Sequence, residues 1–185
     1  IISVETEHHA VLNTLKKLEK QGFEVALLHP DEEGLVSPQQ VEAAIREDTA
    51  LVSVMYANNE IGTIAPVADI GRICRERGVV FHTDAVQAAG NIAIDVKAQE
   101  IDMLSLSAHK FHGPKGIGLL YARRGTELVS LIEGGAQERG RRAGTENLPA
   151  IAGMAAAFSE ACINRQENTI KTAQLRDYVI SRLSE

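Results

Sequence analysis

The sequence predicts an α/β domain built around a largely parallel sheet. Short apolar runs typical of buried strands alternate with segments whose apolar residues recur at helical spacing, nearly throughout the chain. The 185 residues, 44% of them hydrophobic, are enough for one domain with a real core. Open parallel sheets bind ligands at the carboxyl ends of their strands. We therefore expect the functional residues to follow the strands directly.

The first elements are read from apolar runs and helix-end signals. Residues 1–4 are apolar and predict a strand, and the apolar residues within 11–18 predict a helix. Gly22 stands where a helix C-terminus favours glycine, and residues 23–28 predict a second strand. The segment Ser-Pro-Gln-Gln at 37–40 has an N-cap serine, a proline at the first helical position and the glutamine of a capping box, which together open the next helix.

The middle of the chain continues the alternation. Residues 50–56 form an apolar run suited to a buried parallel strand. Pro66 opens a helix that Gly78 closes, and residues 79–83 and 101–106 predict two further strands.

The last part of the sequence turns from strands to helices. A Gly/Pro-rich turn leads to one more apolar run at 117–122. Beyond Leu148 the pattern predicts an Ala-rich apolar stretch at 151–162 and then a polar helix at about 166–183.

Composition excludes several classes of function. A net charge of -6 and the lack of a dense basic run argue against nucleic-acid binding. No apolar stretch is long enough for a membrane span, and none of the six histidines forms the i, i+4 pair of a zinc helix, so we expect no metal. The two cysteines, Cys74 and Cys162, lack the C-x-x-C spacing. Both are predicted to be buried, inert thiols, with a cytoplasmic setting as the expectation.

Polar residues follow three of the predicted strands and are expected to converge on one crevice. They are Asn58, Asn59 and Glu60 after the strand at 50–56, Asp84 and Gln87 after 79–83, and Ser107, His109 and Lys110 after 101–106.

Two of these residues suggest a particular chemistry. A lysine crowded or desolvated at a strand end can form a Schiff base with an aldehyde, although Lys110 also fits a polar surface loop. A carboxylate at the end of an apolar strand can stabilise a protonated pyridine nitrogen, although Asp84 also fits an ordinary turn cap. Taken singly, the residues leave both alternatives open.

Other polar residues are suited to the same kind of ligand. Gln87 can donate to a ring hydroxyl, His8 can stack on a planar ring, and Asn59 offers an amide, although each also fits a turn or an exposed position. The glycine- and arginine-rich segment 134–147 has amides and cations suited to a phosphate, or is a plain surface loop.

Considered together, five ordered motifs resemble one family, the cysteine desulfurases. The motifs are TEHHAV at 6–11, ANNEIG at 57–62, HTDAVQ at 82–87, SAHK at 107–110 and RAGTEN at 142–147. The chain is similar to the central part of such an enzyme, of the kind that supplies sulfur for iron–sulfur clusters or nitrogenase. This resemblance implies the large domain of a fold-type-I transferase dependent on pyridoxal 5'-phosphate, with a mostly parallel sheet flanked by helices. Selenocysteine lyases share most of these motifs.

The resemblance also implies a role for each site residue. Lys110 is expected to bond the cofactor and shuttle a proton, and His8 to stack over the ring and assist acid–base steps. The remaining cofactor contacts are Asp84 to the ring nitrogen, Gln87 to the ring hydroxyl, Asn59 to cofactor and substrate, Ser107 and His109 to the phosphate, and Thr145 to the phosphate of the other subunit's cofactor. The implied substrate is L-cysteine and the implied partners are a second copy of the chain and a sulfur-acceptor or scaffold protein.

The sequence departs from the family in one respect that bears on activity. The family's nucleophilic cysteine, which takes the sulfur as a persulfide, lies in a loop far downstream of the lysine, and neither Cys74 nor Cys162 is expected to replace it. We therefore expect an internal segment of a longer enzyme, inactive alone, with residues 1–165 in the cofactor-binding domain and 166–185 in a helix leading to a further domain. A folded segment without catalytic activity is the alternative from another functional class.

Overall fold

A single mixed sheet organises the computed structural model, which describes residues 1–184. Its six strands lie in the order β2-β1-β3-β4-β5-β6. They are β1 (Ile2–Val4), β2 (Ala26–Leu28), β3 (Leu51–Ser53), β4 (Val80–Asp84), β5 (Met103–Ser107) and β6 (Gly118–Ala122). Strands β1 to β5 are mutually parallel, and β6 runs antiparallel to β5. The predicted, mostly parallel sheet is confirmed.

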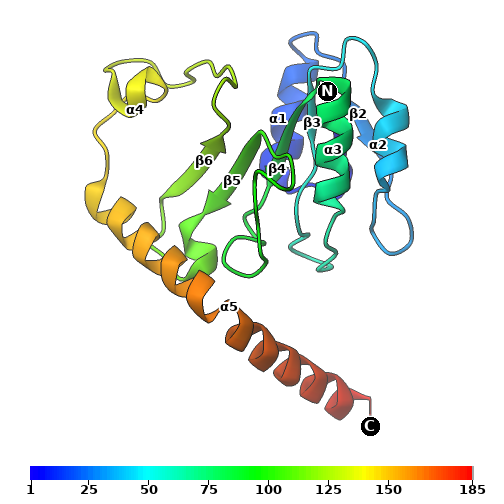
Figure 1. Cartoon of the computed structure of the whole chain (residues 1–185), viewed down its shortest axis with the longest axis vertical. Helices are drawn as coiled ribbons and strands as arrows, with labels where there is room; N and C mark the ends of the chain where they lie inside the picture. Colours follow the sequence, from blue (N-terminus) through cyan, green and yellow to red (C-terminus); the bar gives the residue numbers. More distant parts are fainter. Residues whose placement is uncertain (185) are drawn as a thin grey trace.

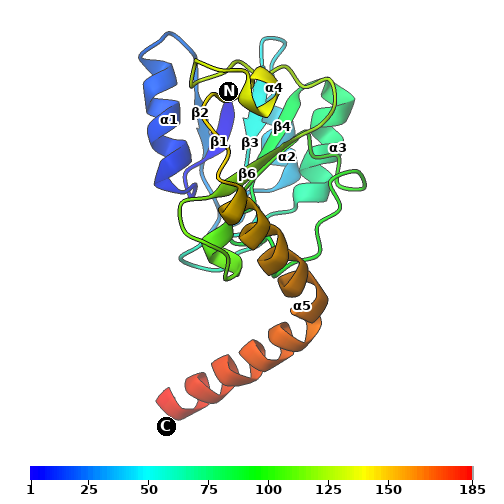
Figure 2. The same cartoon turned by 90° about the vertical axis from the view of Figure 1, so that its left-hand side faces the viewer.

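Helices cover both faces of this sheet. The helices of the described residues are α1 (His9–Glu19), α2 (Pro38–Ala44), α3 (Val67–Arg77), the short 3-10 helix η1 (Ala108–Phe111), α4 (Gln137–Gly140) and α5 (Leu148–Leu183). Helix α2 packs on α3, and α1 lies on the opposite side of the sheet from α3 (Figure 2). Only the single turn of η1 and a short loop connect β5 to β6, so β6 can pair antiparallel with β5 without a crossover helix.

The predicted helix-end signals act as expected. Ser37 Oγ accepts the backbone N–H of Gln40, and the Gln40 side chain accepts the backbone N–H of Ser37, which completes a capping box at the start of α2. Gly78 ends α3 at φ 68°, a left-handed conformation that glycine adopts without steric cost.

The main core lies between the sheet and the helices α2 and α3. Val41 and Ile70 of these helices are fully buried, as are Val52 and Phe81 of the strands they cover. Cys74 belongs to the same cluster, so its predicted burial is confirmed. This packing fixes the strands whose ends carry the polar residues discussed below.

Helix α5 differs from its prediction in two ways. The Ala-rich stretch and the polar stretch form one continuous helix, Leu148–Leu183, whose first half packs on η1 and whose second half projects away from the sheet (Figure 1). The predicted burial of Cys162 is wrong, because Cys162 is exposed. The helix buries only one side, around Met154, and Cys162 lies outside that contact. No helix within residues 1–184 is both long and apolar enough to cross a membrane.

Candidate functional site

One cavity of about 300 Å³ gathers most of the predicted site residues. Its lining consists of His8, Ala10, Met55, Asn59, Asp84, Val86, Gln87, Ser107, His109 and Lys110. The predicted convergence of the strand ends is therefore confirmed for six residues drawn from three different strand ends, together with His8 at the start of α1.

Parallel strand order explains why these residues meet. β3, β4 and β5 are neighbours in the sheet and point the same way, so the segments that follow them share one edge. Asn58 and Glu60, which were expected at the same crevice, do not line this cavity. Asn58 instead stabilises its own turn, where Oδ1 accepts the backbone N–H of Glu60 and of Ile61.

Asp84 is held at the last position of β4 with its carboxylate at the cavity. Only 9% of the residue is exposed, and its Oδ1 accepts the backbone N–H of Val86 at 2.9 Å. The backbone on both sides is fixed as well, because Tyr56 N donates to Asp84 O at 2.8 Å and Asp84 pairs with Ser105 in the neighbouring strand. A nearly buried carboxylate with a rigid backbone presents a negative charge in a fixed place.

Lys110 lies on η1, the single turn that follows β5. The turn closes tightly: Gly113 N donates to Ala108 O at 2.9 Å, and a Cβ on Gly113 would lie 2.9 Å from the Ala108 side chain. His112, directly after the turn, adopts the left-handed conformation at φ 66°, which is uncommon for a non-glycine residue. Among the described residues, no carboxylate lies within ion-pair distance of Lys110. The amine is thus positioned by its backbone and left available to a ligand.

His8 caps α1 and has a defined ring orientation. Its Nδ1 accepts the backbone N–H of Ala10 at 3.2 Å, so in the neutral ring the proton is on Nε2. Ser107 and His109 are also paired, with 2.9 Å between Ser107 Oγ and His109 Nδ1. Together they place a hydroxyl and an imidazole beside Lys110.

Among the residues that were expected to contact the cofactor, Thr145 is the one that does not line this cavity. It is exposed and lies between α4 and α5, in a segment beyond β6 (Figure 1). Its predicted contact belongs to another subunit, so its role stays a prediction.

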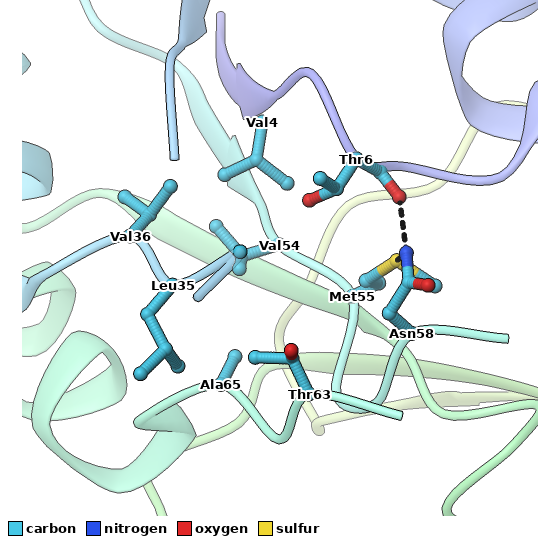
Figure 3. A pocket seen from close by; sticks show the side chains of 10 residues that line it. Val4, Thr6, Leu35, Val36, Val54, Met55, Asn58, Thr63 and Ala65 are labelled. Carbon is cyan, nitrogen blue, oxygen red and sulfur yellow. Dashed lines mark hydrogen bonds between the residues drawn. The ribbon is translucent and has the colours of Figure 1, made fainter. Parts of the chain in front are cut away.

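A second, much smaller cavity lies next to the turn that Asn58 stabilises (Figure 3). Its volume is about 20 Å³, room for about one water molecule. Valine, leucine and threonine side chains dominate its walls, and Asn58 Nδ2 donates to Thr6 O at 2.8 Å across one end. Such a space is too small for a cofactor.

Sequence reasoning missed three residues of the larger cavity and one buried residue near it. Met55, Val86 and Ala10 complete the lining. Met55 lies two residues beyond the end of β3 but inside the run 50–56 that was predicted as a strand, so the rule applied to the polar residues did not reach it. Glu7 is buried next to this group, and nothing in the sequence pattern distinguishes it from an exposed glutamate.

The comparisons with known proteins agree on one family. The family model for class-V aminotransferases matches residues 1–185. The cysteine desulfurase IscS of Clostridium botulinum (strain Hall) is 53% identical over 180 residues, which are 97% of this chain and 45% of that relative. The chain spans about half the length of the curated relatives it matches.

Two solved structures support the same assignment. A NifS-like protein superposes with a TM-score of 0.95 at 44% identity, over 99% of this chain and 51% of its own. The structure of SspA in complex with cysteine matches with a TM-score of 0.83 at 49% identity, over 85% of this chain and 46% of its own.

Proposed function

The chain belongs to the class-V aminotransferase family, whose cysteine desulfurases are its relatives, and we propose that it forms the cofactor-binding part of a cysteine desulfurase. In this proposal the whole protein converts L-cysteine to L-alanine and passes the sulfur on as a persulfide for iron–sulfur cluster assembly. The single observation that carries the proposal is the meeting of Lys110 and Asp84, with His8 and Gln87, in one cavity of about 300 Å³.

The family depends on pyridoxal 5'-phosphate, and the cavity fits that group in volume and chemistry. A volume of about 300 Å³ lies in the range of small-molecule pockets. Its lining offers an amine for an aldehyde, a nearly buried carboxylate for a ring nitrogen, and a hydroxyl–imidazole pair for a phosphate. When bound, pyridoxal phosphate serves as an electron sink for bonds broken at a substrate α-carbon.

The proposed roles follow from what each side chain can do. Lys110 bonds the cofactor and moves a proton to and from the substrate α-carbon. Asp84 keeps a proton on the ring nitrogen, because its carboxylate is fixed and largely shielded from water. Gln87 donates to the ring hydroxyl, Asn59 orients cofactor and substrate, and His8 stacks over the ring and assists proton transfer. Ser107 and His109 bind the phosphate, together with Thr145 of the other subunit.

The nucleophile that receives the sulfur is proposed to be neither cysteine of this sequence. Burial, with a smaller contribution from the charge of Asp102, raises the pKa of the Cys74 thiol to about 12. Cys162 is exposed but lies on α5, outside the cavity lining. The segment alone is therefore proposed to bind the cofactor without releasing sulfur from cysteine.

Substrate, assembly and location complete the proposal. The similarity to SspA, whose structure holds cysteine, supports L-cysteine as the substrate. We place the protein in the cytoplasm as a homodimer that delivers sulfur to an acceptor or scaffold protein. The division into a cofactor domain at 1–165 and a connecting helix at 166–185 belongs to the same proposal. A selenocysteine lyase is the alternative, since the same residues suit that substrate.

Covalent labelling tests the proposal. The protein is mixed with pyridoxal phosphate and reduced with borohydride, and its peptides are analysed by mass spectrometry. We expect the cofactor mass on the peptide that contains Lys110 and its loss in Lys110→Ala. Lys115→Ala is the matched control, because Lys115 is an exposed lysine on the same loop outside the cavity lining. Labelling that survives in Lys110→Ala contradicts the assignment.

A further inference from the structure

Glu7 is a buried acid that the proposed mechanism does not use. Only 5% of the residue is exposed, and neither Oε1 nor Oε2 has a hydrogen-bond partner among the described residues. An ionised carboxylate in that state is costly, because it loses water without gaining a donor. This environment therefore favours the protonated, neutral form of Glu7.

Its surroundings place Glu7 beside the cavity lining. The preceding residue is held by the bond from Asn58 Nδ2 to Thr6 O (Figure 3), which ties the end of β1 to the turn after β3. A second bond, from Tyr56 N to Asp84 O, connects the turn after β3 to the end of β4. His8, the next residue, lines the cavity with Asp84. Glu7 thus lies among the ends of β1, β3 and β4, close enough for the Asp84 charge to act on it.

The two carboxyl groups have opposite environments. Asp84 accepts a backbone N–H at 2.9 Å and reaches the cavity, and both features favour its ionised form. Glu7 has neither a donor nor contact with solvent. Two neighbouring acids whose environments differ in this way take different protonation states.

The pKa of Glu7 agrees with this asymmetry. The pKa of Glu7 is raised to about 8, mainly by burial and to a smaller extent by the like charge of Asp84. The backbone N–H of Met55 opposes the rise without reaching hydrogen-bonding geometry. Among the described residues, Asp84 is the one charged side chain that contributes to the shift.

From this geometry we propose that Glu7 and Asp84 form a carboxyl pair that holds one proton and one negative charge, with the proton on Glu7. Glu7 is then a positioning residue: while it stays neutral, Asp84 is the one anion of the pair, on the side that faces the cavity. The charge assignment concerns the cofactor-free protein. Its use, to present that anion to a ring nitrogen, rests on the proposed function.

Infrared difference spectroscopy of the cofactor-free protein tests the assignment directly. Exposed carboxyls are ionised by about pH 6.5, so a protonated C=O stretch at that pH reports a shifted acid. We expect this band in the wild type, its loss as pH rises through about 8, and its absence from Glu7→Gln, which mimics the neutral acid. The exposed residue Glu127 provides the matched control, and Glu127→Gln should keep the band.

A second variant keeps the test decisive even if Glu7→Gln does not fold. In Asp84→Asn the band should persist and titrate at a lower pH than in the wild type, because the like charge has been removed. An Asp84→Asn band that titrates at the same pH as in the wild type would show that the Asp84 charge does not act on the protonated acid and would overturn the proposal, as would a wild type with no band at about pH 6.5. Since no cofactor is present, the outcome is independent of whether Lys110 binds pyridoxal phosphate.

Discussion

Asp84 and Lys110 line the same cavity from neighbouring parallel strands. Asp84 is the last residue of β4, and Lys110 lies on the turn that follows β5. Pairing of Asp84 with Ser105 fixes the register between the two strands, so the carboxylate and the amine cannot shift independently. A flat ring bonded to one can therefore be held by the other, which is the arrangement that the proposed function requires.

Asp84→Asn should separate cofactor binding from proton removal. We expect Lys110 to bond pyridoxal phosphate in the variant, because the amine and its turn are unchanged. Exchange of the substrate α-proton with solvent should fall on the order of 10²-fold or more, since a neutral amide does not hold a proton on the ring nitrogen. Exchange is followed by proton NMR in deuterated water with the cofactor-loaded protein. An unchanged exchange rate would rule out this role for Asp84.

Phe111→Ala should loosen the turn that carries Lys110. Phe111 is 2% exposed and packs with Ala108 and Met154, and its ring centroid lies 5.2 Å from that of Phe158. Truncating a buried phenylalanine costs about 3–5 kcal/mol, which urea unfolding measures directly. The control Phe23→Ala, at a residue that is 52% exposed, should change stability by less than about 0.5 kcal/mol. Equal losses of unfolding free energy in the two variants would show that packing of Phe111 around η1 stabilises the domain no more than an exposed phenylalanine does.

The local signals in the sequence and the strand rule account for most of the fold and the site. The capping box of Ser37 and Gln40 and the left-handed Gly78 depend on a few neighbouring residues, so they were predictable. Asp84 and Lys110 were predictable as neighbours because the edge shared by parallel strands depends on topology, not on detailed packing.

What the sequence could not provide depends on contacts between distant segments. Cys162 was expected to be buried because its helix is rich in alanine, but only the side of α5 around Met154 meets the domain. No sequence signal distinguishes Glu7 from an exposed glutamate, because its burial depends on segments that lie far apart in the sequence. Thr145 stays a prediction, because its contact belongs to a second copy of the chain.

The two cysteines should react very differently with a thiol reagent. Burial raises the pKa of Cys74 to about 12, so almost none of it is thiolate at neutral pH, whereas Cys162 is exposed. With Ellman's reagent at pH 7.5, the thiol of Cys162 should react on the order of 10²-fold faster than that of Cys74. Cys162→Ser should remove the fast phase and Cys74→Ser should leave it. A fast phase that is lost in Cys74→Ser would contradict the buried placement.

His82 should make the stability of the domain sensitive to acid. Its ring joins three strands, with 2.9 Å from Nδ1 to Ser53 Oγ and 2.9 Å from Nε2 to Ser105 Oγ. Burial lowers the pKa of His82 below its usual 6.5, and the charge of Asp84 opposes this in part. Below pH 6.5 the unfolded chain binds a proton at this position more readily than the folded one, so stability is lost as pH falls through that value.

His82→Leu removes both the hydrogen bonds and the titrating group, so its effect should depend on pH. At pH 8 the ring is neutral and bonded, and the variant should be less stable than the wild type by about 1–3 kcal/mol. As pH falls towards about 5.5 the difference should shrink, because only the wild type loses stability through His82. The control is Thr83→Val in the same strand, which replaces a buried hydroxyl that has no hydrogen-bond partner among the described residues and removes no titrating group. Because this variant keeps His82, its free energy of unfolding should differ from that of the wild type by the same amount at both pH values. Urea unfolding at the two pH values measures the free energy of unfolding of both variants. If the stability difference between His82→Leu and the wild type grew on acidification, the folded protein would take up a proton on His82 more readily than the unfolded chain, which would contradict the prediction.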